Sequence, residues 1–342
     1  MSKHLAGNKF MLFLLIWFIS VQLILAIVVP ALGQVFEFEP AAVYASPWFM
    51  IGVQLVVLLL PLLFWLKIKR DKLALHTPSW KLGVKNIVLI VALSFLLQPV
   101  MMTISGISSL FFTNYVSEVI YSLMSYPLWL ILFAMAVTPA VCEELVFRGY
   151  IQSQHRSRRF KQAAFLNGLF FAIIHLSLQQ FAYAFVMGTV FFVMVHYTRS
   201  IWAGILPHFI VNASQGMLGR WAFSSLDEGY YAAQDVELFE SLFPNISPEV
   251  LAIIIIGVFA LCLSPVIIIL FREFIKHNRQ RIAAAEWQKS REQDNVFDEN
   301  YQAPSEIANA DTPPVESPPL IDRYMIAVVG VFVLFQVLAN VI

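Results

Sequence analysis

Runs of about 20 apolar residues recur along this chain of 342 residues and constrain its fold more than any other feature. Hydrophobic residues make up 59% of the sequence and charged residues 13%, about half of the charged share of a soluble domain. Because the bilayer core offers the backbone no water, apolar segments of this length are expected to be helices. Nine such segments are predicted, at residues 10–33, 46–66, 86–112, 127–150, 163–178, 181–198, 201–218, 249–271 and 324–342. The sequence therefore predicts an all-α, polytopic transmembrane bundle of eight core helices plus a C-terminal ninth span.

Lysines and arginines concentrate in alternate connections between these segments. The connections at 67–85, 156–161 and 272–281 are basic, whereas those at 34–45 and 113–126 contain no lysine or arginine. By the positive-inside rule, this alternation predicts a cytoplasmic N-terminus and an external C-terminus. The formal net charge is zero, so nothing in the charge pattern favours a nucleic-acid partner.

The chain divides into four predicted regions. Residues 1–85 form an N-terminal two-span region with a basic cytoplasmic loop, and residues 86–271 form the core. Residues 272–322 are polar and end in an acidic, proline-rich stretch that is expected to be partly disordered. Residues 323–342 form the last span. The first span is expected to be retained, although small residues near 31–33 leave cleavage open.

Three of the apolar segments carry polar side chains at helical spacing. The first contains Glu143, Glu144 and Arg148. The others pair Phe171 with His175 and His208 with Asn212, each four residues apart and hence on one helix face. Counted at 1.5 Å per residue from the nearest basic connection, the ionisable groups lie at similar depths of roughly 14–21 Å. Ionisable groups inside a membrane usually face a cavity or a partner, so a shared polar chamber is predicted.

Two related chemistries fit a carboxylate near two imidazoles. The carboxylate can act as a general base on water, or the imidazoles of His175 and His208 and the carboxylate of Glu143 can hold a zinc ion. Arg148 is expected to hold Glu144 in an ion pair, which leaves Glu143 for chemistry. Asn212 can donate a hydrogen bond to an oxyanion.

Other interpretations of the same residues stay open at this point. Glu144 and Arg148 can form a purely structural ion pair, and buried histidines often serve as core or interhelical hydrogen-bonding residues. The same network also suits a proton-coupled transporter or a non-catalytic membrane scaffold. The histidines in polar surroundings, His4, His76, His155 and His277, are expected to be solvated.

With these residues in view, the chain resembles the CAAX-protease and bacteriocin-processing family of intramembrane endopeptidases, which includes the type II CAAX prenyl endopeptidases. The first motif of that family, two glutamates followed by three residues and an arginine, matches Glu143, Glu144 and Arg148. Its second and third motifs match Phe171 with His175 and His208 with Asn212. The three motifs occur in the expected order on separate segments, over about residues 86–218.

The resemblance implies a membrane-embedded endopeptidase that hydrolyses a peptide bond near or within the bilayer. Its substrate is a peptide or protein that can be lipid-modified, as in CAAX-type processing, or a peptide of bacteriocin maturation or immunity. Glu143 is implied as the residue that activates water, with His175, His208 and Asn212 completing the site. Members are commonly called metalloproteases, so zinc is a candidate cofactor. The bacterial inner membrane is the expected location.

Overall fold

The computed structural model describes residues 5–123, 125–227, 245–294 and 319–341, and all the extended regular structure in these ranges is helical. The elements are α1 (Ala6–Phe36), α2 (Pro40–Tyr44), α3 (Pro47–Gln54), η2 (Leu55–Leu59), α4 (Leu60–Lys69), η3 (Leu73–Leu75), α5 (Val84–Leu96), α6 (Gln98–Ser109), α7 (Tyr115–Ser122), α8 (Leu128–Leu132), η4 (Phe133–Val137), α9 (Thr138–Glu144), η5 (Leu145–Ile151), α10 (Gln152–Gln154), α11 (Phe160–Ile173), α12 (Leu178–Thr198), α13 (Trp202–Asp227), α15 (Pro248–Asp294) and α16 (Arg323–Val341). The all-α, polytopic bundle predicted from the sequence is confirmed.

Six helices within the described ranges are long and apolar enough to cross a membrane, judged by length and composition. They are Ala6–Phe36, Pro47–Lys69, Val84–Ser109, Leu128–Gln154, Leu178–Thr198 and Pro248–Gln288. Two shorter apolar helices, Phe160–Ile173 and Arg323–Ala339, join them, and α13 contains all but the first residue of the predicted segment 201–218. The chain is therefore an integral membrane protein.

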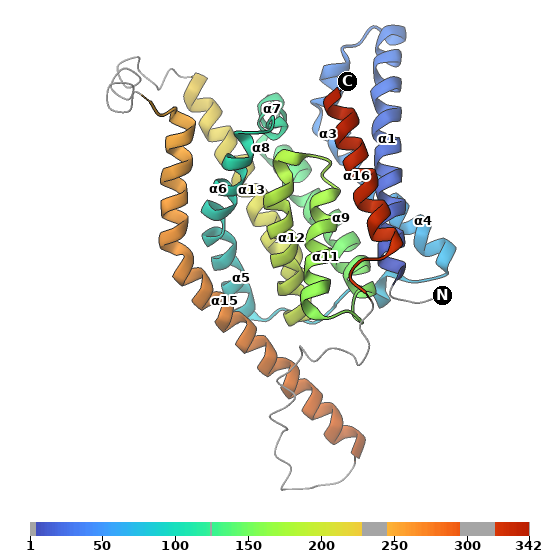
Figure 1. Ribbon diagram of the computed structural model, residues 1–342, viewed down its shortest axis with the longest axis vertical. Coiled ribbons are helices and arrows are strands. Elements are labelled where there is room, and N and C mark those ends of the chain that lie inside the picture. Colours follow the sequence, from blue (N-terminus) through green and yellow to red (C-terminus); the bar gives the residue numbers. More distant parts are fainter. Residues whose placement is uncertain (1–4, 124, 228–244, 295–318, 342) are drawn as a thin grey trace.

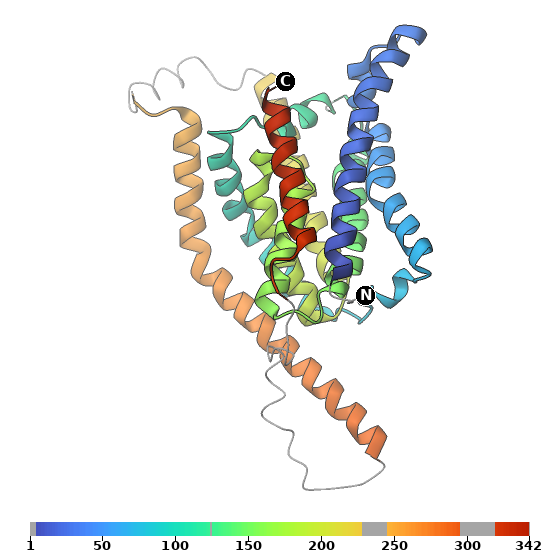
Figure 2. The same cartoon turned by 45° about the vertical axis from the view of Figure 1, so that its right-hand side comes forward.

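The helices run roughly alongside one another, and α11 packs closely against α12 (Figure 1). The terminal helices α1 and α16 lie side by side, although they come from opposite ends of the chain (Figures 1 and 2). Helix α15 follows one edge of the bundle and then projects beyond it (Figure 2). This projection is the start of the predicted polar region, whereas residues 295–318 of that region lie outside the described residues.

Two predicted segments differ in detail from the helices that form. The segment predicted at 163–178 ends as a helix at Ile173, because the chain turns at Leu176, whose φ of 50° is left-handed. The segment predicted at 86–112 is divided at Leu97, directly before the Gln98-Pro99 start of α6. Proline lacks the N–H that would continue the helical ladder, which accounts for the second break.

One end of the bundle collects the basic connections, and we call it the basic end. Arg156 Nη2 donates to the carbonyl oxygen of His76, and the Trp80 N–H donates to the carbonyl oxygen of Arg199. Arg281 donates to the carbonyl oxygen of Lys81. Connections that are far apart in sequence therefore meet at the same end, as alternate crossings require.

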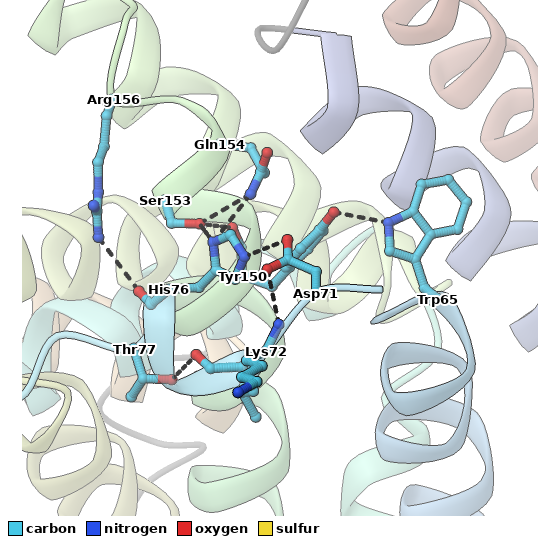
Figure 3. A network of polar contacts seen from close by, with 10 residues as sticks. Trp65, Asp71, Lys72, His76, Thr77, Tyr150, Ser153, Gln154 and Arg156 are labelled. Atoms are coloured by element: carbon cyan, nitrogen blue, oxygen red, sulfur yellow. Dashed lines mark hydrogen bonds and ion pairs between the residues drawn. The ribbon is translucent and has the colours of Figure 1, made fainter. Parts of the chain in front are cut away.

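A hydrogen-bonded cluster anchors the helix of Glu143 and Glu144 at the basic end (Figure 3). The His76 ring bonds Ser153 Oγ through Nδ1 and Asp71 Oδ2 through Nε2, both at 2.8 Å. Nearby, Trp65 donates to the Tyr150 hydroxyl at 2.7 Å. The serine, histidine and aspartate are arranged in the order of a hydrolase triad. However, Ser153 Oγ donates its hydrogen to the Tyr150 carbonyl at 2.6 Å and not to His76, so the arrangement is a structural one. This cluster thus joins the loop after α4 to the end of α10.

A second cluster of hydrogen bonds, which is buried, surrounds His155 directly after α10. Asn167 donates to His155 Nδ1 at 3.1 Å, so His155 Nε2 carries the hydrogen and donates to Asn8 Oδ1 at 3.0 Å. Asn8 donates in turn to Asp322 at 2.6 Å, and Arg158 pairs with the same carboxylate at 3.3 Å. The prediction that His155 is solvated is wrong, because its side chain is covered by α1 and α11 and is 1% exposed.

We predict that the fold loses stability in mild acid through His155. Burial, together with the positive charge of Arg158, lowers the pKa of His155 to about 3 from an ordinary value of 6.5. Between pH 6.5 and 3, His155 is therefore protonated in the unfolded chain but not in the folded chain. The contribution of His155 to the free energy of unfolding is complete above pH 6.5 and is lost as the pH falls toward 3. Between pH 6.5 and 5 the loss is about 2 kcal/mol.

Thermal unfolding in detergent at these two pH values measures the loss. The His155→Gln variant has no imidazole to titrate, so its unfolding temperature is expected to change less between the same two pH values. An equal change in the wild type and the variant contradicts the assignment.

Candidate active site

A fully buried ion pair forms the base of the site. Glu144 Oε1 lies 3.0 Å from Arg148 Nη1 and 3.0 Å from His208 Nδ1, and neither the Glu144 nor the Arg148 side chain is exposed. An ionised carboxylate can only accept hydrogen bonds, so His208 Nδ1 carries a hydrogen and donates it. The remaining His208 nitrogen, Nε2, lies 4.0 Å from Glu143 Oε2. Glu144 therefore fixes how the His208 ring is presented to Glu143.

The aromatic ring of Phe171 supports both the arginine and the histidines. The Arg148 guanidinium lies 4.4 Å from the centroid of this ring, close enough for a cation–π contact. The His175 and His208 rings meet it edge-on, with centroids 5.1 Å and 5.7 Å away. Arg148 also donates to the carbonyl oxygen of Gly188 at 3.0 Å. Phe171 thus contacts three of the predicted site residues from a single position.

His175 lies just beyond the end of α11, where the helix has already stopped. Its Nδ1 donates to the carbonyl oxygen of Phe171 at 2.7 Å, which satisfies one of the last orphan carbonyls of the helix. This bond fixes the tautomer and leaves Nε2 as the ring nitrogen that can accept a hydrogen bond. The turn at Leu176 follows immediately.

Glu143 differs from its neighbour in what surrounds its carboxylate. Its side chain is 15% exposed and lines a chamber together with His175, His208 and Asn212. Among the described residues, no hydrogen-bond partner reaches Glu143 Oε2, although this oxygen is buried. The pair predicted from the sequence is thus divided in the structure: Glu144 is bound behind the chamber, and Glu143 faces into it.

Asn212 is held in place by a backbone carbonyl that Pro139 leaves without its usual helical partner. A residue at position 139 with an N–H would donate it to the carbonyl oxygen four residues earlier, that of Met135, but proline has none. Asn212 Nδ2 donates to this carbonyl at 3.1 Å. The helix adjusts on both sides, because η4 and η5 are π-helical and flank α9. Such π-helical turns occur frequently at functional sites.

Together these contacts bring all six predicted residues into one region. Glu143, His175, His208 and Asn212 line the chamber, whereas Glu144 and Arg148 lie directly behind its wall. Three polar residues that the motifs did not single out, Gln180, Tyr183 and Gln215, also line it. Of these three, only Gln215 has a recognisable spacing in the sequence, since it follows Asn212 by one helical turn. That spacing alone does not distinguish it from an ordinary polar residue on the same helix.

The predicted zinc ligands do not fit a metal site in this arrangement. Among the residues that the structure describes, no three His, Cys, Asp or Glu side chains lie close enough to hold one ion. His208 Nδ1 is engaged by Glu144 and His175 Nδ1 by a backbone carbonyl, so the two Nε2 atoms are the imidazole nitrogens that remain as possible ligands. The zinc expected at His175, His208 and Glu143 stays a prediction, and no step of the mechanism below depends on it.

Gly204, at the start of α13, makes room for the buried carboxylate. A Cβ added at this position would overlap Glu144 Oε2, whereas one added at Gly216 in the same helix has no atom within 4 Å. We therefore predict that Gly204→Ala displaces Glu144, lowers stability by about 1–3 kcal/mol through overpacking and reduces peptidase activity.

The matched variant Gly216→Ala is expected to keep wild-type activity and to gain up to about 1 kcal/mol from helix propensity. Thermal unfolding and cleavage rates of the two variants check this. Equal behaviour of the two alanine variants contradicts the role given to Gly204.

Comparison with family models matches residues 125–214 to the family described as type II CAAX prenyl endopeptidase Rce1-like. Comparisons with curated proteins and with solved structures give no match. The matched stretch runs from just before α8 into α13, so it contains every residue of the three motifs. The family resemblance predicted from these motifs is thus confirmed over residues 125–214, which are similar to the type II CAAX prenyl endopeptidase Rce1-like family.

Proposed function

We propose that this protein is an intramembrane endopeptidase in which Glu143 activates the attacking water. The observation that carries this proposal is the division between the two adjacent glutamates. Glu144 is paired with Arg148 and His208 through Oε1 and does not line the chamber, whereas Glu143 lines the chamber and its Oε2 has no hydrogen-bond partner among the described residues. A carboxylate that the protein itself does not use is available for substrate or water.

In the proposed mechanism, Glu143 accepts a proton from a water molecule in the chamber. The resulting hydroxide attacks the carbonyl carbon of the peptide bond and forms a tetrahedral oxyanion. Glu143 then returns the proton to the leaving amine as the carbon–nitrogen bond breaks, so the carboxylate is regenerated. The Nε2 atoms of His175 and His208 can accept the second hydrogen of the water and orient it.

The family match supports a CAAX-type substrate, that is, a peptide with a prenylated cysteine near its C-terminus. Prenyl groups partition into bilayers, so such a substrate reaches a site inside the membrane from the lipid or from its surface. We further propose that the basic end of the bundle faces the cytoplasm, because basic connections favour that side. A bacterial inner membrane is the proposed location.

Glu143→Gln is predicted to abolish cleavage while leaving the fold intact. The amide keeps the shape of the side chain but cannot take up a proton, and general-base catalysis is typically worth about 10²–10⁴-fold in rate. The measurement is cleavage, by purified protein in detergent, of a fluorogenic peptide ending in a farnesylated CAAX sequence and of its unprenylated counterpart.

Glu118→Gln serves as the control, since Glu118 is an exposed glutamate on α7. This variant is expected to cleave at the wild-type rate. Cleavage by Glu143→Gln at the wild-type rate rules out the proposed base, and a folded wild type that cleaves neither peptide contradicts the proposed function. Proton-coupled transport by such a protein then favours a relay role for the same residues.

A metal-free preparation is predicted to retain activity. The described side chains offer no three-ligand set, and the mechanism uses only Glu143 and the chamber around it. The test is cleavage after dialysis against a chelator, with zinc content measured on the same sample. Loss of activity that is restored by added zinc overturns this prediction and returns His175, His208 and Glu143 to the role of metal ligands.

A further inference from the structure

Besides a base, the chamber must supply hydrogen-bond donors to the oxyanion. When water adds to a peptide carbonyl, negative charge develops on its oxygen, and donors aimed at that oxygen lower the barrier. The groups predicted for this role are largely engaged within the protein. His208 Nδ1 binds Glu144, and Asn212 Nδ2 gives one of its two hydrogens to the Met135 carbonyl.

Arg148 is a charged donor that does not reach the chamber. It is fully buried, with Nη2 donating to the Gly188 carbonyl, Nη1 in an ion pair with Glu144 and the guanidinium over the Phe171 ring, and its Nε has no hydrogen-bond partner among the described residues. It does not line the chamber. Moving it into the chamber would leave the Glu144 carboxylate buried and without its cation, which is strongly unfavourable.

Tyr183 offers a donor that is not engaged. It lies on the chamber-facing side of α12, one turn before Met187, and both residues line the chamber with Glu143. Its ring packs against two hydrophobic clusters, one containing Phe147 and Phe171 and the other containing Met187 and Phe191. Within the described part of the chain, no hydrogen bond to its hydroxyl is found, so the O–H is free to donate.

Helix α12 packs closely against α11 near Gly188. A Cβ at Gly188 would lie 2.8 Å from the Phe171 Cβ and 3.0 Å from the Gly168 Cα, so α11 and α12 are in backbone contact here. The same turn supplies the Gly188 carbonyl that binds Arg148. Tyr183 therefore lies on a helix that packs closely against α11 and binds Arg148 through its backbone.

We propose that Tyr183 is a further catalytic residue, which donates its O–H to the developing oxyanion of the tetrahedral intermediate. This inference rests on the proposed function. The hydroxyl keeps its proton throughout, so the proton balance between water, Glu143 and the leaving amine is unchanged. The second N–H of Asn212 completes a pair of donors, from α12 on one side and α13 on the other.

Tyr183→Phe tests the proposal by removing a single oxygen atom. The turnover number on the farnesylated CAAX peptide is expected to fall about 100-fold, the typical effect of losing one oxyanion donor. KM is expected to stay within a factor of two or three of the wild-type value, about the size of a 0.6 kcal/mol change, because the bond forms mainly in the transition state. The unfolding temperature is expected to stay at the wild-type value, because no protein group loses a partner.

The matched control is Tyr197→Phe, on the same helix at the basic end. Its hydroxyl lies 3.3 Å from Arg279 and not in the chamber, so turnover should be unchanged. Wild-type turnover in Tyr183→Phe overturns the assignment. A lower unfolding temperature with proportionate loss of active protein shows a structural role and overturns it as well.

Glu143→Gln, measured in parallel, separates this inference from the proposed function. If Glu143→Gln is inactive and Tyr183→Phe is fully active, the general base stands and only the role of Tyr183 is wrong. If Glu143→Gln cleaves normally, both proposals fail.

Discussion

The buried ion pair between Glu144 and Arg148 is the interaction on which the rest of the site depends. Two charges inside a membrane bundle are costly unless each is fully paired, and removing either partner leaves the other stranded. Glu144 Oε1 meets both Arg148 and His208 at 3.0 Å, so one carboxylate oxygen joins the glutamate helix to α13. Arg148 extends the network to α12 through the Gly188 carbonyl and to α11 through the ring of Phe171. Four helices are thus held in register by a single pair of charges.

This arrangement explains why two adjacent glutamates can have opposite roles. Successive residues of a helix point about 100° apart, so when Glu144 faces the packed interior, Glu143 is directed toward the chamber. His208 bridges the two, with Nδ1 on Glu144 and Nε2 toward Glu143. The irregular backbone near the glutamates also positions a site residue, because Pro139 leaves the Met135 carbonyl without a helical donor and Asn212 binds it. A gap in the helical ladder is thereby used to position a side chain of the site.

Much of this site could be predicted from the sequence, because the cost of charge in apolar surroundings is visible there. The motif spacing and the similar depths of Glu143, His175 and His208 predicted one chamber, and the four-residue spacing predicted the pairing of Glu144. Tertiary contacts could not be predicted in the same way. His155 is buried because the first helix and α11 cover it, although its sequence neighbours are polar and basic. The π-helical turns and the polar residues that line the chamber from α12 likewise depend on packing rather than on local pattern.

The two adjacent glutamates have different roles, Glu144 in stability and Glu143 in chemistry, and comparing the thermal unfolding of Glu143→Gln and Glu144→Gln tests this difference. Glu143 Oε2 has no hydrogen-bond partner among the described residues, so its replacement is expected to leave the unfolding temperature unchanged or to raise it. Replacing Glu144 strands the Arg148 charge, and the expected loss is about 3–5 kcal/mol, several degrees in unfolding temperature. Equal unfolding temperatures for the two variants, or a larger loss for Glu143→Gln, rule out these separate roles.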